Sequence, residues 1–257
     1  MPLPHPARTD IHPVLFVGAG PGSPDLLTVG AAKAIGTAGV ILHDRLVSAE
    51  ILALAPRLAT VLDVGKEGFG KAMPQAEINA LTVAFGLSGR RVVRLKSGDG
   101  GIFGRLDEEI EAVAAAGLDW KILPGITSAA AAAATIGQSL TRRGRNGSLR
   151  IITGHDAEGF AEQDWRSLAR PGEIAAIYMG KRAARFLQGR LMMHGADPAT
   201  PVTIVESASR SDERIHGATL ATLPAMADAI DGPAVILFGL APRRAAPALP
   251  ELREVRS

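Results

Sequence analysis

The stretch that decides the fold runs Val14-Leu-Phe-Val-Gly-Ala-Gly-Pro-Gly-Ser-Pro-Asp-Leu-Leu-Thr28. Its apolar start, 14–17, is typical of a buried parallel strand, and apolar residues follow the glycines at helical spacing. Ser23 is a good N-cap, and Pro24 suits the first position of a helix. The segment therefore predicts a strand, a glycine loop and a helix over 24–36. In that geometry the backbone of the glycines, which carry no side chain, can approach a ligand closely at the carboxyl end of a sheet.

The glycine loop differs from the dinucleotide-binding fingerprint. That pattern requires a third glycine where this chain has Ser23, and it has no proline at the position of Pro21. Similar turns also serve only to reverse a chain. By itself the loop leaves open a nucleotide-dependent oxidoreductase and a non-enzymatic module that binds anionic ligands.

Strands and helices alternate through the first half of the chain. Further strands are predicted over 40–43, 92–95 and 120–123, with helices near 74–87 and 104–116. Alternation of this kind indicates a mostly parallel sheet with helices on its faces.

The regular alternation of strands and helices ends after a run of six alanines, the last of which is Ala134. Apolar segments then predict strands over 149–153, 174–178, 202–205 and 234–238, with 214–219 as a further candidate. We expect an α/β protein of two domains, the second with a mixed sheet. The expected divisions are 13–128, 129–241 and a flexible tail over 242–257.

Composition excludes several classes of function. The 257 residues are 47% hydrophobic and carry a net charge of +2, which favours substantial cores and argues against nucleic acid as a partner. Without cysteine the chain has no disulfide or thiol nucleophile, and its scattered histidines predict no metal site. The uncharged stretch 122–141 is broken by Pro124 and Gly125, so we expect a packed helix rather than a membrane span. The first dozen residues lack an apolar signal core, which predicts a cytoplasmic protein.

Five segments in register resemble the tetrapyrrole methylase family. They are Gly18–Thr28, His43–Ser48, Val64–Lys66, Arg91–Arg105 and Pro124–Ser128. The resemblance spans roughly 13–240. The Asp-Arg-Leu-Val part of the second segment is most similar to the branch of the family that methylates uroporphyrinogen III.

The resemblance implies a homodimer of two α/β domains with the active site in the cleft between them. It implies transfer of methyl groups from S-adenosylmethionine to C2 and C7 of uroporphyrinogen III. The products are precorrin-2, a precursor of sirohaem and cobalamin, and S-adenosylhomocysteine. Some members carry a fused dehydrogenase–ferrochelatase module, for which this chain has no room, so we expect the stand-alone methylase. A related precorrin methyltransferase is the alternative within the family.

The resemblance also assigns residues. Asp44 and Lys66 receive proton-transfer roles, although Asp44 on its own would equally suit a ribose contact, a helix cap or an ion pair with Arg45. The cofactor is placed at Pro21, Ser97, Gly98, Asp99, Ile102, Thr127, Ser128, Met179, Ala208 and Ala234. Capping alone would explain Thr127 or Ser128, and Met179 would otherwise be read as core.

Arginines are the expected partners of the substrate, because it carries eight carboxylates and guanidinium groups bind carboxylates bidentately. Arg94 and Arg105 lie on motifs that face the site. Further candidates are Arg45, Arg142, Arg143 and Arg145.

The cofactor loop departs from the family pattern. Relatives read Gly-Gly-Asp-Pro followed by a bulky residue, whereas this chain has Ser97, Gly100 and Gly101 at the variable positions. Paired glycines predict a looser loop.

Overall fold

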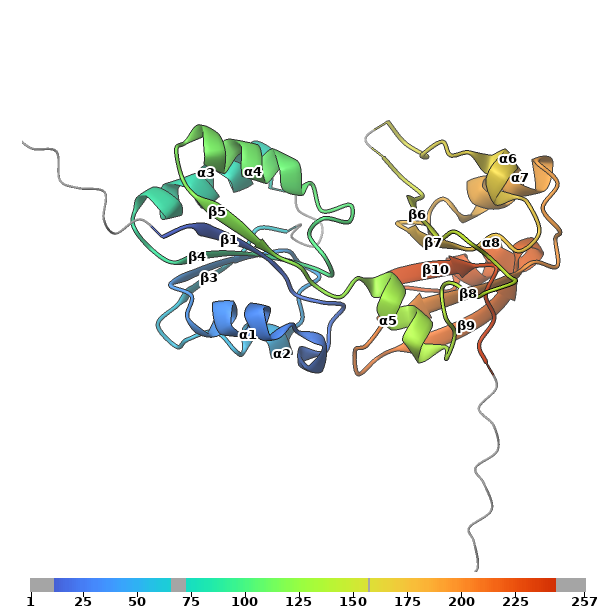
Figure 1. Cartoon of the computed structure of the whole chain (residues 1–257), viewed down its shortest axis with the longest axis horizontal. Helices are drawn as coiled ribbons and strands as arrows, with labels where there is room; N and C mark the ends of the chain where they lie inside the picture. The colour runs from blue at the N-terminus through green and yellow to red at the C-terminus, as the bar shows by residue number, and fades with distance from the viewer. Residues whose placement is uncertain (1–11, 66–72, 157, 244–257) are drawn as a thin grey trace, which may run out of the picture.

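The computed structural model describes residues 12–65, 73–156 and 158–243, which form two five-stranded sheets (Figure 1). The first sheet has the order β3-β2-β4-β1-β5, and all its strands are parallel. Its strands are β1 (Val14–Gly18), β2 (Val40–His43), β3 (Thr60–Asp63), β4 (Val92–Lys96) and β5 (Trp120–Leu123). The predicted parallel sheet is therefore confirmed.

Helices cover both faces of the first sheet (Figure 1). They are α1 (Val29–Gly36), α2 (Ala49–Leu52), α3 (Gln75–Leu87) and α4 (Leu106–Ala115). Ile35 and Ile51 pack with one face, whereas Ile78 and Val113 pack with the other. Strand β1 lies inside the sheet between β4 and β5 and is mostly buried, which explains the continuous hydrophobic run at the start of the chain.

The predicted helix over 24–36 is wrong in one respect, because it is divided in two. A single 3-10 turn, Pro24–Leu26, comes first, and the Ser23 hydroxyl accepts from Asp25 N at 3.2 Å. Helix α1 begins only at Val29, since Thr28 provides a second cap that accepts from Ala31 N at 3.1 Å.

The second sheet is mixed, as predicted, with the order β6-β7-β10-β8-β9. Its strands are β6 (Arg150–Thr153), β7 (Ala175–Tyr178), β8 (Pro201–Glu206), β9 (Arg214–Thr219) and β10 (Ala234–Phe238). Only β6 and β7 pair in parallel. The candidate strand over 214–219 is confirmed.

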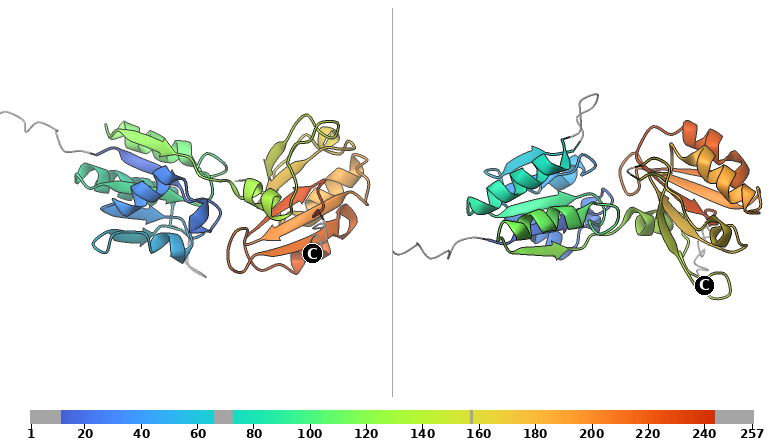
Figure 2. Two further views of the ribbon diagram at one scale, coloured as in Figure 1. Left: turned by 60° about the horizontal axis from the view of Figure 1, so that its bottom comes forward. Right: turned by 90° about the horizontal axis from the view of Figure 1, so that it is seen from above.

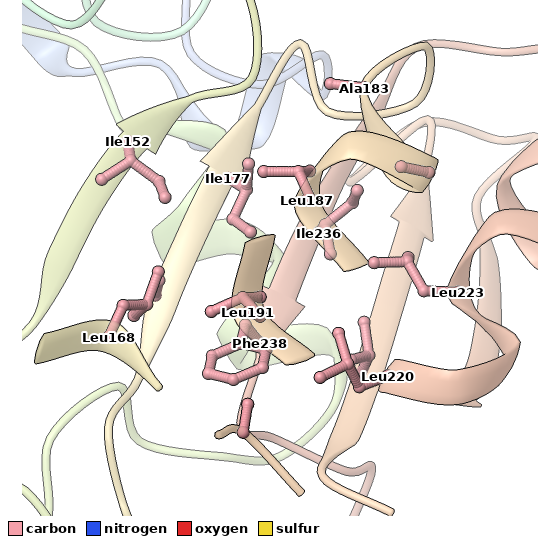
Figure 3. Close-up of a cluster of buried hydrophobic side chains, with 14 of the residues drawn as sticks. Ile152, Leu168, Ile177, Ala183, Leu187, Leu191, Leu220, Leu223, Ile236 and Phe238 are labelled. Atoms are coloured by element: carbon pink, nitrogen blue, oxygen red, sulfur yellow. The ribbon is translucent and has the colours of Figure 1, made fainter. Parts of the chain in front are cut away.

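The second sheet is also covered on both faces. The alanine-rich helix α5 (Ser128–Thr135) packs on one face. The helices α6 (Trp165–Leu168), α7 (Ala184–Met193) and α8 (Leu223–Asp228) cover the other face, over a core that includes Ile177, Leu187 and Leu223 (Figure 3). The chain passes from one sheet to the other between β5 and α5 (Figure 2). The division at residue 128 stays a prediction, and most of the predicted tail lies outside the described residues.

Three glycines bring the loops at the carboxyl ends of the first sheet into backbone contact. A Cβ on Gly125 would lie 2.1 Å from Gly98 O, and one on Gly18 would lie 2.4 Å from Gly125 N. Gly98 also exchanges backbone hydrogen bonds with Gly20, at 2.8 and 3.0 Å. This close packing places three loops together at the edge that faces the second sheet.

Among the described residues, no helix is both long enough and apolar enough to cross a membrane.

Candidate active site

A cavity of about 660 Å³ lies between the two sheets and is lined by residues from both. Six of the ten predicted cofactor residues are among them: Pro21, Ser97, Ser128, Met179, Ala208 and Ala234. Met179 has a left-handed backbone (φ 52°) and is 51% exposed, so it does not belong to the core. The structure thus brings together residues that are more than two hundred positions apart in the chain.

The loop after β4 carries three more of the predicted cofactor residues. Gly98 has a φ of +66°, which favours glycine. Asp99 holds the loop in place, because its Oδ1 accepts from Gly101 N at 2.8 Å and its Oδ2 accepts from Gly125 N at 3.0 Å. Ile102 follows in a turn, with its N–H donating to Asp99 O. The carboxylate of Asp99 therefore orders the paired glycines that predicted a looser loop.

Helix α5 is not capped by its own sequence neighbours, the alternative role considered for Thr127 and Ser128. Neither Thr127 nor Ser128 makes a side-chain cap. Instead the hydroxyl of Tyr178, at the end of β7, accepts from Ala129 N at 2.9 Å and forms a hydrogen bond with the Thr127 hydroxyl. Tyr178 therefore ties the start of α5 to the end of the second sheet, at the wall of the cavity.

Asp44 follows β2 and lies beside the cofactor loop. Its Oδ1 accepts from Arg94 Nη2 at 2.5 Å, and its Oδ2 accepts from Ser97 N at 3.4 Å. The side chain is 32% exposed. Its neighbours Arg45 and Leu46 line the cavity. Asp44 is thus a half-buried carboxylate held on one side by a guanidinium.

Arg94 does not reach the cavity, which differs from its expected role as a substrate ligand. It is 1% exposed, and its guanidinium donates to Asp44, Glu109, Leu42 O and Leu95 O. Burial alone would lower the pKa of Arg94, but the charges of Asp44 and Glu109 outweigh that effect and raise it. The sequence could not show this, because Glu109 lies on α4 and becomes a partner only in the folded chain.

Within the part of the chain that the structure describes, the other cations predicted to bind substrate do not contact Asp44 or Glu109 through side-chain hydrogen bonds. Arg105 has a left-handed backbone (φ 53°), and its exposed guanidinium pairs with Glu108 at 2.6 Å. The described cavity lining does not include Arg105, Arg142, Arg143 or Arg145, and Arg145 binds Ser139 O and Asn146 within its own loop. Lys66 lies outside the described residues.

Sequence reasoning missed three cations that line the cavity: Lys181, Arg182 and Arg210. Lys181 Nζ donates to Asp231 O at 2.9 Å and to Gly232 O at 2.8 Å. Arg182 is exposed beside it. The signal was available, since both residues directly follow the segment Tyr178–Gly180 that carried part of the resemblance.

Arg210 crosses from the second domain to the first. Its Nη2 donates to Leu46 O, and its side chain covers Gly22, where any Cβ would collide with it. The neighbouring Ser209 hydroxyl accepts from Ser23 N at 3.1 Å. These contacts close one end of the cavity against the loop that carries Asp44.

Glu206 supports the opposite wall. Its carboxylate accepts from Gly232 N at 2.6 Å and pairs with His216 Nε2 at 3.2 Å. The hydrogen bond from Gly232, reinforced by His216, lowers the pKa of Glu206. Among the described residues, no group of three or more acidic or histidine side chains is placed to hold a metal ion.

Comparison with known families finds a match over most of the chain. Residues 13–224 match the family described as Tetrapyrrole (Corrin/Porphyrin) Methylases. The chain is 42% identical over 233 residues to siroheme synthase 2 of Aeromonas hydrophila, and 44% identical over 229 residues to siroheme synthase of Methylococcus capsulatus. These alignments cover 91% and 88% of this chain but 50% and 48% of the relatives. The chain therefore spans about half the length of the curated relatives it matches.

Solved structures match over nearly their full length. The uroporphyrin-III C-methyl transferase of Thermus thermophilus, complexed with S-adenyl homocysteine, has a TM-score of 0.77 at 34% identity. That match covers 89% of this chain and 92% of the other. A cobalt precorrin-4 methyltransferase has a TM-score of 0.78 at 28% identity, covering 88% and 94%.

Proposed function

Because the chain belongs to the tetrapyrrole methylase family, we propose that it transfers methyl groups from S-adenosylmethionine to C2 and C7 of uroporphyrinogen III, giving precorrin-2. The observation that carries the proposal is the cavity between the two sheets, where loops from both domains meet. The likeness to a uroporphyrin-III C-methyl transferase complexed with S-adenyl homocysteine supports the same cofactor and substrate.

The residues at the cavity fit S-adenosylmethionine. The backbone contacts among Gly18, Gly98 and Gly125 hold together the loops that carry Pro21 and Ser97 at the cavity, and the exposed Met179 offers an apolar contact from the other domain. The cofactor, when bound, supplies an electrophilic methyl group on a sulfonium. We propose that the ten predicted residues hold it, with Asp99 acting through the backbone that it orders.

The chain's contribution to the reaction is mainly positional. A pyrrole carbon is already nucleophilic, so holding two reactants in line can supply about 7–11 kcal/mol of the barrier. A proton must afterwards leave the methylated ring or move around it, and a fixed carboxylate can assist that step. We assign this role to Asp44, with Lys66 as its proposed companion.

Substrate carboxylates require cations around the cavity. Arg45 and Arg182 line the cavity from opposite domains and are exposed, and Arg105 is exposed outside that lining, directly before α4. We propose that these guanidinium groups bind the acidic side chains of the macrocycle. We also propose that the protein is a homodimer and that it acts in the cytoplasm. The resemblance to the family supports the dimer.

S-adenosylhomocysteine should raise the melting temperature of the purified chain. A ligand that binds only the native state, at about 100 times its dissociation constant, stabilises it by about 2.7 kcal/mol. Thermal denaturation with S-adenosylhomocysteine, and with NADPH as the matched comparison, measures this effect. A shift with NADPH alone would favour the nucleotide-dependent oxidoreductase.

Arg105→Ala should weaken substrate binding more than cofactor binding. A charged hydrogen bond contributes about 1.5–3 kcal/mol, so the KM for uroporphyrinogen III should rise about tenfold or more, while that for S-adenosylmethionine stays unchanged. Arg185→Ala is the control, because Arg185 is exposed and pairs with Asp228 away from the cavity. Equal effects on both KM values would make Arg105 structural.

A further inference from the structure

Next to Asp44 lies a buried cluster of charges that the proposed chemistry does not explain. Arg94, Lys96 and Glu109 are only 1%, 2% and 1% exposed. Ions removed from water cost several kcal/mol each unless they are paired and hydrogen-bonded. Three such groups at the edge of the sheet that carries the site therefore call for a functional explanation.

Glu109 is the centre of this cluster. Its carboxylate accepts from Arg94 Nε at 2.8 Å, Arg94 Nη2 at 3.1 Å and Lys96 Nζ at 2.6 Å. A fourth donor, Gln75 Nε2, lies at 3.2 Å from the same carboxylate. Glu109 thereby joins α3, α4 and β4 in one hydrogen-bonded group.

One branch from Glu109 leads to Asp44. With Nε on Glu109 and Nη1 shared between two backbone carbonyls, Arg94 directs Nη2 at Asp44 Oδ1. The guanidinium is planar and rigid, so its orientation on Glu109 determines where Nη2 lies. The position of the Asp44 carboxylate therefore depends on a residue that does not touch it.

The other branch leads to the cofactor loop. The stem of Lys96 runs under residues 100–104: a Cβ on Gly100 would lie 3.1 Å from Lys96 Cδ, and one on Gly104 would lie 3.0 Å from Lys96 Cε. The ammonium at the end of that stem is held by Glu109. Burial and the nearby charge of Arg94 lower the pKa of Lys96.

The charges balance only when all four groups are counted. Arg94 and Lys96 supply two positive charges, and Glu109 and Asp44 supply two negative charges. Asp44 is the member that reaches solvent, at 32% exposure of its side chain. If Glu109 lost its charge, two buried cations would be left to share Asp44.

We propose that Glu109 is a positioning residue of the active site, which fixes the Asp44 carboxylate through Arg94 and supports the cofactor loop through Lys96. The proposal rests on the proposed function, because Asp44 must take part in methyl transfer for its position to matter. When Glu109 is uncharged, Arg94 and Lys96 have only Asp44 as a counter-charge. We expect them to draw the Asp44 carboxylate inward, away from Ser97.

Glu109→Gln tests the proposal by steady-state kinetics of methyl transfer. We expect kcat to fall about 10²-fold, as displacement of a reacting group by about 1 Å can do, with a smaller rise in the KM for S-adenosylmethionine because the cofactor loop loses part of its support. The double variant Lys96→Met/Glu109→Gln removes one charge of each sign and leaves Arg94 paired with Asp44. It should recover most of the lost kcat.

Crystal structures of both variants provide a readout that does not depend on activity. The Arg94–Asp44 contact should be displaced in Glu109→Gln and restored in the double variant. A single variant with unchanged kcat and geometry would overturn the proposal, and so would a double variant no better than the single. If the wild-type chain methylates no tetrapyrrole, the proposed function fails, and the structures still decide whether Glu109 positions Asp44.

Discussion

Asp44→Asn is expected to lower turnover about 10²- to 10⁴-fold while leaving the fold and the affinity for S-adenosylhomocysteine intact. That range is typical of losing a group that assists proton transfer. Asparagine keeps the shape of the side chain and can still accept from Arg94 through its amide oxygen, but it carries no charge and cannot take up a proton. Rapid-quench measurement of methyl transfer, with cofactor affinity determined by calorimetry, separates chemistry from binding.

Asp63→Asn is the matched control for this variant. Asp63 lies at the carboxyl end of a strand of the first sheet, where its Oδ1 accepts from Gly65 N at 2.8 Å, but unlike Asp44 it has no sequence neighbour in the lining of the described cavity. Its turnover should stay near that of the wild type. An Asp44→Asn variant that turns over normally would reduce Asp44 to an ion-pair partner of Arg94.

Arg94→Met is expected to lower the free energy of unfolding by about 3–5 kcal/mol, which is typical of breaking a buried ion pair from one side. The change leaves Glu109 and Lys96 buried without the guanidinium between them and Asp44. It also removes the donor to Leu42 O and Leu95 O. Urea denaturation followed by circular dichroism measures the loss.

Arg185→Met makes the same substitution in an exposed pair. The Arg185 and Asp228 side chains are 79% and 62% exposed, and such pairs contribute about 1 kcal/mol or less. If both variants lowered the free energy of unfolding by the same small amount, the buried cluster would contribute no more to stability than a surface ion pair. The account of Glu109 as a positioning residue would then lose its energetic basis.

The elements that sequence analysis predicted are those whose pattern is local. The strand 14–17, the glycine loop and the strand 40–43 carry unbroken apolar runs between turn residues, and the structure confirms them. Strand β3 was missed, because it is an edge strand of four residues with alternating exposure and no continuous apolar run. The second cap at Thr28 was missed, because two competing N-caps stood five residues apart.

The parts of the site that sequence analysis missed depend on distant partners. Tyr178 caps α5 across 49 positions of sequence, and no local pattern marks it as a helix cap. Arg94 lies on a motif next to the site, yet its direction is decided by Glu109 on another element. Motifs therefore marked residues that line the cavity, whereas burial and long-range pairing decided which charged side chains reach it.

Anaerobic incubation of the purified chain with uroporphyrinogen III and S-adenosylmethionine, followed by mass spectrometry of the tetrapyrrole, tests the central claim most directly. The account predicts a product with two additional methyl groups, heavier by two CH2 units because each transfer releases a proton, and two molecules of S-adenosylhomocysteine for each product molecule. An unchanged uroporphyrinogen mass, alongside methylation of a later precorrin supplied in parallel, would contradict it and assign the chain to another branch of the family.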